Sequence, residues 1–130
     1  MVEADKLDQY LEECCRKYAL DACAVVTKSG DVLENAGDFI PDICLKAVPE
    51  WLSMAYQMAN SSALKGLSYA CLASPDQRQH LVGWKFEWAA DVELFVLLCM
   101  RHIPRHMHAI QRDMQRDIAT FIVRKSAVLQ

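Results

Sequence analysis

Apolar residues recur along the first part of the chain with the spacing of a helix that buries one face. Over Asp5–Leu20 they stand at Leu7, Tyr10, Leu11, Cys14, Cys15 and Tyr18. The next segment, Ala22–Thr27, is apolar at both alternating sets of positions, which predicts a central strand covered on both faces. Val32–Ala36 is shorter and more polar, as expected of an edge strand. The pattern therefore predicts a helix followed by two strands.

Helical spacing returns over Pro41–Leu64. Pro49 has no amide hydrogen to donate, so we expect this helix to begin near Pro49 or to be kinked there. Three further strands are predicted at Leu67–Ser74, His80–Trp88 and Val92–Met100, the last of them again central. A long apolar stripe from Ile103 onward predicts a final helix with Pro104 in its first turn. The predicted order is α-β-β-α-β-β-β-α.

Length and composition suit one globular domain that spans residues 1–130. The apolar fraction is 53%, which is enough for a core without disulfides, so six cysteines are expected as reduced thiols. The net charge of −3 gives no electrostatic basis for nucleic-acid binding. The longest apolar run, Leu94–Met100, is too short to insert across a bilayer, and the acidic start lacks the features of a signal peptide. A cytoplasmic protein is expected.

The stretch VVTKSGDVLENAG at 25–37 raises the question of a phosphate-binding loop or a reactive serine. A phosphate-binding loop needs several glycines between a strand and a helix, where backbone amides meet the anion. Here Ser29-Gly30 lies between two predicted strands, which is typical of a two-residue hairpin turn. A nucleophilic serine would need a strand-to-helix elbow and a paired histidine, which the local sequence lacks. We interpret the stretch as a turn.

Histidines and cysteines offer weak signals of chemistry. His102 and His106 are four residues apart, which on a helix would place two imidazoles on one face, a geometry that zinc can use. The H-E-x-x-H pattern is absent, and solvated side chains near a helix start are the simpler interpretation. No C-x-x-C pair exists, and most cysteines lie on apolar stripes, where a thiol acts as a small hydrophobe. We therefore expect no metal, no cofactor and no catalytic residues.

Two apolar features go beyond a simple core. Trp84, Phe86 and Trp88 alternate along one strand and share a face, which favours a core under a helix and leaves a partner-binding surface as the alternative. The middle helix is apolar on more than one side, and the edge strand at Tyr69–Ala73 carries no charge. Both properties favour self-association. The residues expected at a dimer interface are Trp51, Met54, Tyr56, Met58, Tyr69 and Cys71.

The first helix followed by DACAVVTKSGDVLENAGDF at 21–39 resembles the roadblock family, which has a longin-like or profilin-like fold. Gly37-Asp38 stands where that family has a Gly-Asp in a polar loop. The resemblance implies an α+β fold with a five-stranded antiparallel sheet ordered 2-1-5-4-3. It places the middle helix on one face and the terminal helices on the other. It also implies homodimers or heterodimers without catalytic residues, which act as adaptors or regulators of small Ras-like GTPases or in scaffold complexes.

Three functional hypotheses follow. The first is a non-enzymatic dimeric module, paired with itself or a paralogue, that binds a small GTPase or a scaffold protein. The second is a secretion chaperone that binds an extended effector segment. The third is a profilin-like or GAF-like ligand sensor, which would need a pocket between sheet and helix. In that case some of Cys71, Cys99, His80 and His102 should converge on the pocket.

Overall fold

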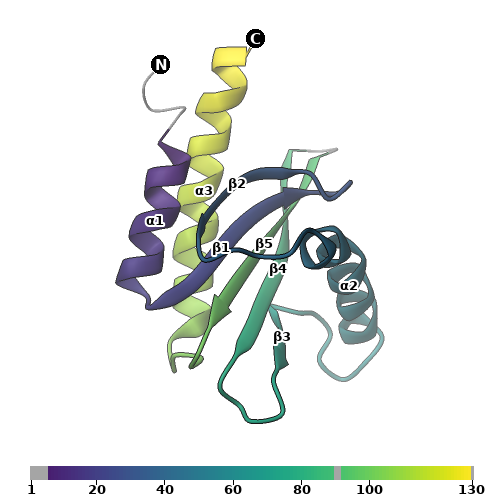
Figure 1. The fold of residues 1–130 in the computed structure, drawn as a ribbon. Helices are drawn as coiled ribbons and strands as arrows, with labels where there is room; N and C mark the ends of the chain where they lie inside the picture. The colour runs from purple at the N-terminus through teal and green to yellow at the C-terminus, as the bar shows by residue number, and fades with distance from the viewer. Residues whose placement is uncertain (1–5, 90–91, 130) are drawn as a thin grey trace.

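One antiparallel sheet of five strands organises the chain in the computed structural model, which describes residues 6–89 and 92–129 (Figure 1). The strands are β1 (Leu20–Thr27), β2 (Val32–Gly37), β3 (Ala70–Ala73), β4 (His80–Ala89) and β5 (Val92–Met100). The helices are α1 (Leu7–Lys17), α2 (Asp42–Asn60) and α3 (Met107–Leu129). The strand order is β2-β1-β5-β4-β3, which confirms the predicted fold class, element order and sheet order.

The two central strands are buried on both faces, as their continuous apolar sequences predict. Alternate residues of β1 and β5 enter two separate cores. Cys23 and Val96 belong to the larger core, whereas Ala24 and Phe95 belong to the smaller one. The four side chains are fully buried. The sheet therefore needs a helical layer on each side.

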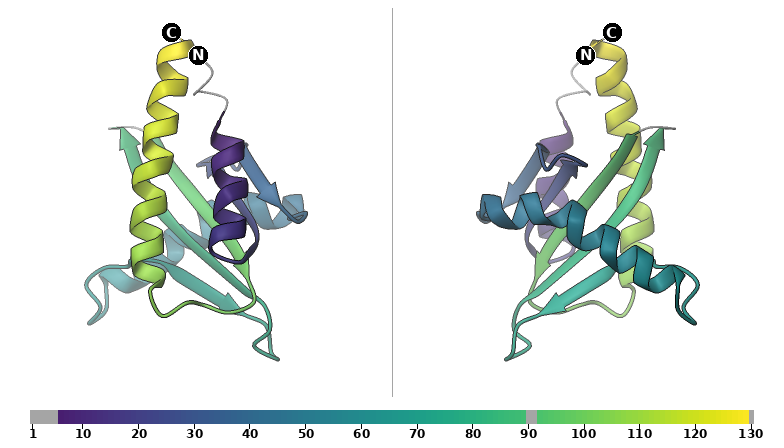
Figure 2. Two further views of the ribbon diagram at one scale, coloured as in Figure 1. Left: turned by 90° about the vertical axis from the view of Figure 1, so that its left-hand side faces the viewer. Right: turned by 90° about the vertical axis from the view of Figure 1, so that its right-hand side faces the viewer.

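Helices α1 and α3 cover one face of the sheet, and α2 covers the other (Figures 1 and 2). Leu11 of α1 and Met114 of α3 lie in the larger core. The Tyr10 hydroxyl donates a hydrogen bond of 2.9 Å to Asp117 Oδ2 and joins the two helices. The Tyr10 ring also lies 5.2 Å from that of Phe121, between centroids. These contacts hold the two terminal elements side by side.

The stretch at 25–37 is a hairpin, but its loop has four residues, 28–31, rather than two. The Thr27 and Asp31 backbones are hydrogen bonded, with N···O 2.9 Å. The Asp31 amide also donates to Thr27 Oγ1, at 3.2 Å, and the Ser29 hydroxyl donates to the Asp31 carboxylate, at 3.1 Å. Gly30 has φ +90°, which favours glycine. The polar groups of this loop therefore stabilise a turn between two strands.

Two helix boundaries differ from the prediction. The first helix ends at Lys17 rather than Leu20, because Ala19 turns the chain with φ 56° and Leu20 enters the sheet as a buried residue. The middle helix begins at Asp42 and continues through Pro49, so of the two alternatives the start near Pro49 is wrong. A proline inside a helix costs about 3 kcal/mol. Burial of Leu45 and other apolar residues on the same helix offsets that cost.

The last helix and the third strand are shorter than predicted. Residues 101–106 form an irregular turn, and α3 begins only at Met107. The Pro104 carbonyl accepts a hydrogen bond from the Met107 amide, at 3.2 Å, so proline lies before the helix and not in its first turn. Strand β3 spans only Ala70–Ala73, because β4 pairs with it from His80 to Gly83 alone.

Leu52 is fully buried between α2 and the sheet, where Gly83 allows the helix to approach closely. A Cβ at Gly83 would lie 3.2 Å from Leu52 Cδ1. Leu52→Ala should therefore lower the free energy of unfolding by about 2–5 kcal/mol, measured by urea denaturation. The exposed neighbour Glu50→Ala should change it by less than about 0.5 kcal/mol. Equal effects of the two substitutions would contradict this packing.

Candidate functional site

Large apolar side chains are exposed on α2 and on the segment that leads into β3. Met54 and Met58 are four residues apart on α2, so they share a helix face, and they are 59% and 71% exposed. Leu64 follows the helix and Leu72 lies in β3; both are also exposed. We call these four residues the α2–β3 surface. Because the opposite side of α2 already fills the smaller core, this surface has no role in the packing of the described chain.

Strand β3 is an edge of the sheet and pairs, within the described residues, with β4 alone. Its neighbourhood, Tyr69–Ala73, contains no charged residue. An uncharged edge strand offers unpaired backbone groups to another strand. The sequence prediction named this edge strand, but its set of dimer-interface residues did not include Leu64 or Leu72. The sequence contained a signal for Leu72. It follows Cys71 in the same short strand, so the two side chains must face opposite sides of the sheet.

The six residues predicted for a dimer interface are distributed over three places. Met54 and Met58 point outward, as described above. Trp51 and Tyr56 are half-buried and pack against the smaller core on the inner side of α2. Tyr69 packs against the larger core, on the opposite face of the sheet. Cys71 is exposed and pairs with Val82, which also belongs to the larger core, so it faces the same way as Tyr69.

The Tyr56 hydroxyl occupies the free edge of β4 where β3 has ended. It accepts a hydrogen bond from the Lys85 amide and donates one to the Lys85 carbonyl oxygen, each at 3.1 Å. The last residue of β4 that pairs with β3 is Gly83, so Lys85 lies beyond the end of that ladder. The Lys85 ammonium lies 4.9 Å from the centroid of the Tyr56 ring. A side chain of α2 thus replaces a missing neighbouring strand.

The aromatic stripe of β4 belongs to the core where the structure describes it. Trp84 is 0% exposed and Phe86 is 5% exposed, both beneath α3. The side chain of Trp88 lies outside the described residues. Trp84 and Phe86 are therefore not available to a partner at the surface of this structure. They form part of a core under a helix, the interpretation that the sequence favoured.

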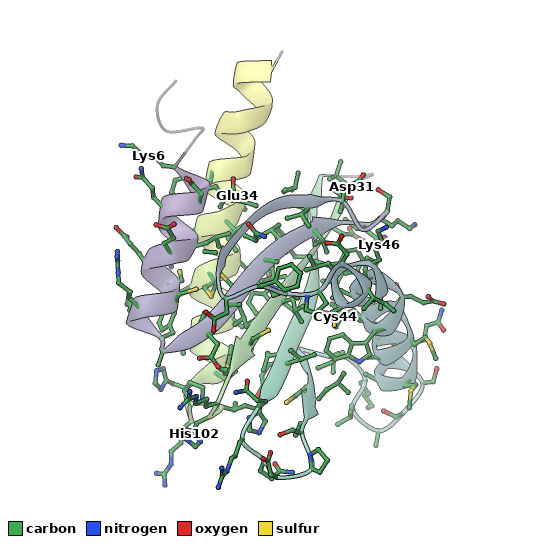
Figure 3. The ribbon with its side chains drawn as sticks, viewed as in Figure 1. Lys6, Asp31, Glu34, Cys44, Lys46 and His102 are labelled. Atoms are coloured by element: carbon green, nitrogen blue, oxygen red, sulfur yellow. The ribbon has the colours of Figure 1, made fainter. Side chains whose placement is uncertain are left out.

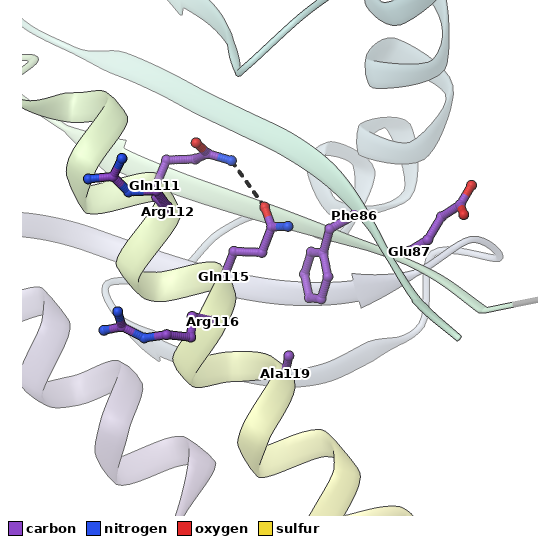
Figure 4. A pocket seen from close by; sticks show the side chains of 7 residues that line it. All are labelled: Phe86, Glu87, Gln111, Arg112, Gln115, Arg116 and Ala119. Carbon is purple, nitrogen blue, oxygen red and sulfur yellow. Dashed lines mark hydrogen bonds between the residues drawn. The ribbon is translucent and has the colours of Figure 1, made fainter. Parts of the chain in front are cut away.

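A groove of about 420 Å³ lies between α3 and β4 (Figure 4). Phe86 and Ala119 supply apolar walls, and Gln111 Nε2 donates to Gln115 Oε1 at 3.1 Å along the helix. Arg112 and Arg116 also border the groove but point away from Phe86 (Figure 4). Its lining contains none of Cys71, Cys99, His80 or His102. The ligand-sensor hypothesis requires some of these four side chains to line one pocket, and none of them lines this groove.

Those four residues also lie apart from one another in the sheet. Cys99 packs against the smaller core, whereas Cys71 faces the other side. His80 Nδ1 donates to the Arg101 carbonyl oxygen, at 2.9 Å. His102 and His106 lie in the irregular turn before α3, so the helical pair suggested by their spacing does not form. Within residues 6–89 and 92–129, no three His, Cys, Asp or Glu side chains form a group that could hold a metal ion.

Of the six thiols, two are buried, three are half-buried and one is exposed. Cys15 and Cys23 approach each other across α1 and β1, with Sγ···Sγ 3.7 Å. Burial raises the pKa of Cys14, Cys15 and Cys23. Burial, with the nearby Asp21 carboxylate, raises the pKa of Cys99 to about 11. A nucleophilic cysteine needs a thiolate, so these thiols are poor nucleophiles near neutral pH.

The fold is that of a roadblock-like domain. No protein-family model matches the chain, and no curated protein matches it in sequence. None of the described helices combines the length and apolar character that a membrane span needs.

Solved structures carry the similarity instead. MglB from Myxococcus xanthus superposes with a TM-score of 0.67 at 9% identity, over 92% of this chain and 96% of that one. A structure described as MglB with tetrameric arrangement gives a TM-score of 0.67 at 15% identity, over 100% and 94%. A roadblock/LC7 domain from Streptomyces avermitilis gives 0.60 at 11% identity, over 95% and 98%. At these identities the similarity establishes the fold.

Removing the Tyr56 hydroxyl should open the edge of β4. Tyr56→Phe loses both hydrogen bonds to Lys85, so we expect the free energy of unfolding to fall by about 1–3 kcal/mol. Native-state hydrogen exchange should also become faster at the Lys85 amide. Tyr69→Phe is the matched control, because the Tyr69 hydroxyl makes no hydrogen bond within the described residues. An unchanged Lys85 exchange rate would contradict the edge-capping role.

Exposure and protonation predict the order of thiol reactivity. With dithionitrobenzoate at neutral pH, Cys71 should react first because it is exposed, although partial burial raises its pKa. Cys14 and Cys23 should react only after unfolding. Cys71→Ser should remove the fastest phase of the reaction. A fast phase that persists in this variant would show an activated thiol elsewhere in the chain.

Proposed function

We propose that this chain is a non-enzymatic dimeric interaction module in the cytoplasm. Its role is that of an adaptor or regulator for a small Ras-like GTPase or a scaffold complex. The observation that carries the proposal is the α2–β3 surface, where exposed methionine and leucine side chains lie next to an uncharged edge strand. A surface of this kind is typical of a site that another protein covers.

A two-fold symmetric dimer would use this surface well. In such a contact each copy presents the same residues, so Met54 and Met58 would pack against their counterparts. Flexible methionine side chains adapt readily to such packing. The β3 strands could pair at the same time and satisfy backbone groups at the edge. The tetrameric arrangement described for one MglB structure concerns that protein, and it supports testing this chain for assembly.

The partner assignment follows from the roadblock resemblance and is compatible with the structure. Trp51 and Tyr56, which the sequence prediction also placed at the interface, would act indirectly by holding α2 against β4. Tyr69 and Cys71 would lie at the margin, because they face the other side of the sheet. A paralogue with the same surface could replace the second copy.

Met58→Glu should convert a dimer into a monomer with the fold retained, because a carboxylate at this position would be buried in the interface. The measurement is mass in solution, by size exclusion with light scattering, against a chain mass of 14.8 kDa. Ile43→Glu is the matched control: Ile43 is 77% exposed and lies in the first turn of the same helix. A mass that Met58→Glu leaves unchanged would remove Met58 from the interface, and a wild-type monomer would overturn the dimer.

The secretion-chaperone hypothesis shares the open β3 edge, which could accept an extended strand of a client. The two hypotheses differ in the form of the partner. A Ras-like GTPase should bind only when folded and loaded with nucleotide. An effector segment should bind equally well as an unfolded synthetic peptide.

A further inference from the structure

We propose that a basic hollow at the end of the sheet formed by the β3–β4 hairpin binds an acidic, extended segment of a partner protein. The hollow has a volume of about 480 Å³ and is lined by Arg78, Gln79, Arg101 and His102. Arg78 and Gln79 come from the β3–β4 hairpin, and the other two from the turn between β5 and α3. His102 marks this end in Figure 3, on the other side of the sheet from α2.

Hydrogen bonds hold the backbone of both arginines in place. Asp76 Oδ1 accepts from the Ser74 hydroxyl at 2.6 Å and from the Arg78 amide at 3.1 Å, which shapes the hairpin turn. These bonds keep the pKa of the Asp76 carboxyl below its usual range. The imidazole of His80 binds the Arg101 carbonyl oxygen at 2.9 Å. The two guanidinium groups are thus carried by fixed turns on either side of one hollow.

The charge of this hollow opposes that of the whole chain. The chain has a net charge of −3, yet this hollow is lined by two arginines and a histidine and by no carboxylate. Arg105 and His106 follow in the same connection, His108 lies in the first turn of α3, and all three are exposed. Like charges at one hollow repel each other unless an anion lies between them. The planar guanidinium fork matches a carboxylate, with two parallel hydrogen bonds.

The dimensions favour a peptide segment over a single small anion. A second hollow of about 310 Å³ shares Arg101 and His102 with the first, and Ala19, Leu20 and Asp21 complete its lining. The two hollows therefore neighbour each other at Arg101 and His102, and we call the pair the trough. Because Asp21 would repel an acid, the segment should place carboxylates in the first hollow and an uncharged or basic residue in the second.

The shape of this end favours a protein over a lipid surface. The β3–β4 hairpin extends past the start of α3 (Figure 1), so the first hollow is recessed beside it. A flat bilayer would meet the hairpin before it reached both arginines. An extended chain can enter the recess. This inference does not depend on the dimer, because the trough and the α2–β3 surface share no residue.

The test uses a fluorescein-labelled oligoglutamate peptide as the probe and fluorescence anisotropy as the readout. We expect saturable binding that weakens with added salt. Arg101→Glu and Arg78→Glu should each weaken it at least roughly tenfold, since each removes a charge-assisted contact and adds repulsion. Arg112→Glu is the matched control: it makes the same charge change at an exposed position of α3, outside the trough, and should leave binding within about twofold. An oligoglutamine peptide of equal length should not bind.

Several results would overturn the proposal. If Arg112→Glu weakens binding as much as Arg101→Glu, the attraction is diffuse and the trough is not a site. If inorganic phosphate at low concentration displaces the peptide completely, the hollow is a small-anion site. If the chain binds vesicles of phosphatidylcholine and phosphatidylserine through Arg101 but does not bind the peptide, its target is a membrane. Far-UV circular dichroism of each variant checks that the fold is retained.

Discussion

Burial of β1 and β5 on both faces is the constraint on which the rest of the structure depends. Val25 and Phe95 are fully buried on opposite faces of the sheet, so each face must be covered by helix. The chain supplies α1 and α3 for one face and α2 for the other (Figure 2). In the observed sheet, β2 and β3 take the edges. The arrangement of helices in two layers therefore follows from the burial of these two strands.

The same requirement gives α2 its two different sides. Its inner side must fill the smaller core, and it approaches β4 closely at Gly83. Its outer side is left apolar at Met54 and Met58, beside the short strand β3. Tyr56 closes the backbone edge that β3 does not reach. The unpaired edge and the exposed methionines both lie outside the packed core, which is why we propose this region as the place where another chain binds.

Positive charge gathers beside this apolar region, at the hairpin that follows β3. The cationic residues that line the trough lie in two connections at one end of the sheet, outside α2 and β3. Apolar contacts supply affinity without strong dependence on salt, whereas exposed charges steer partners and are screened. A domain with both surfaces can hold one partner by packing and recognise another by charge. This division suits an adaptor, the role we propose.

The amino-acid pattern by itself determined the element order, the two central strands and the hairpin at 25–37. Each of those features follows from the spacing of apolar and polar residues within one segment of the chain. It did not determine that the helix would run through Pro49, because core burial elsewhere on that helix offsets a local cost. It grouped Trp51 and Tyr56 with Met54 and Met58, and only the tertiary structure separated inner from outer side chains. Arg78 and Arg101 are distant in sequence and meet because β4 and β5 are paired. Which residues share a surface is decided by packing between segments, and no local pattern contains that information.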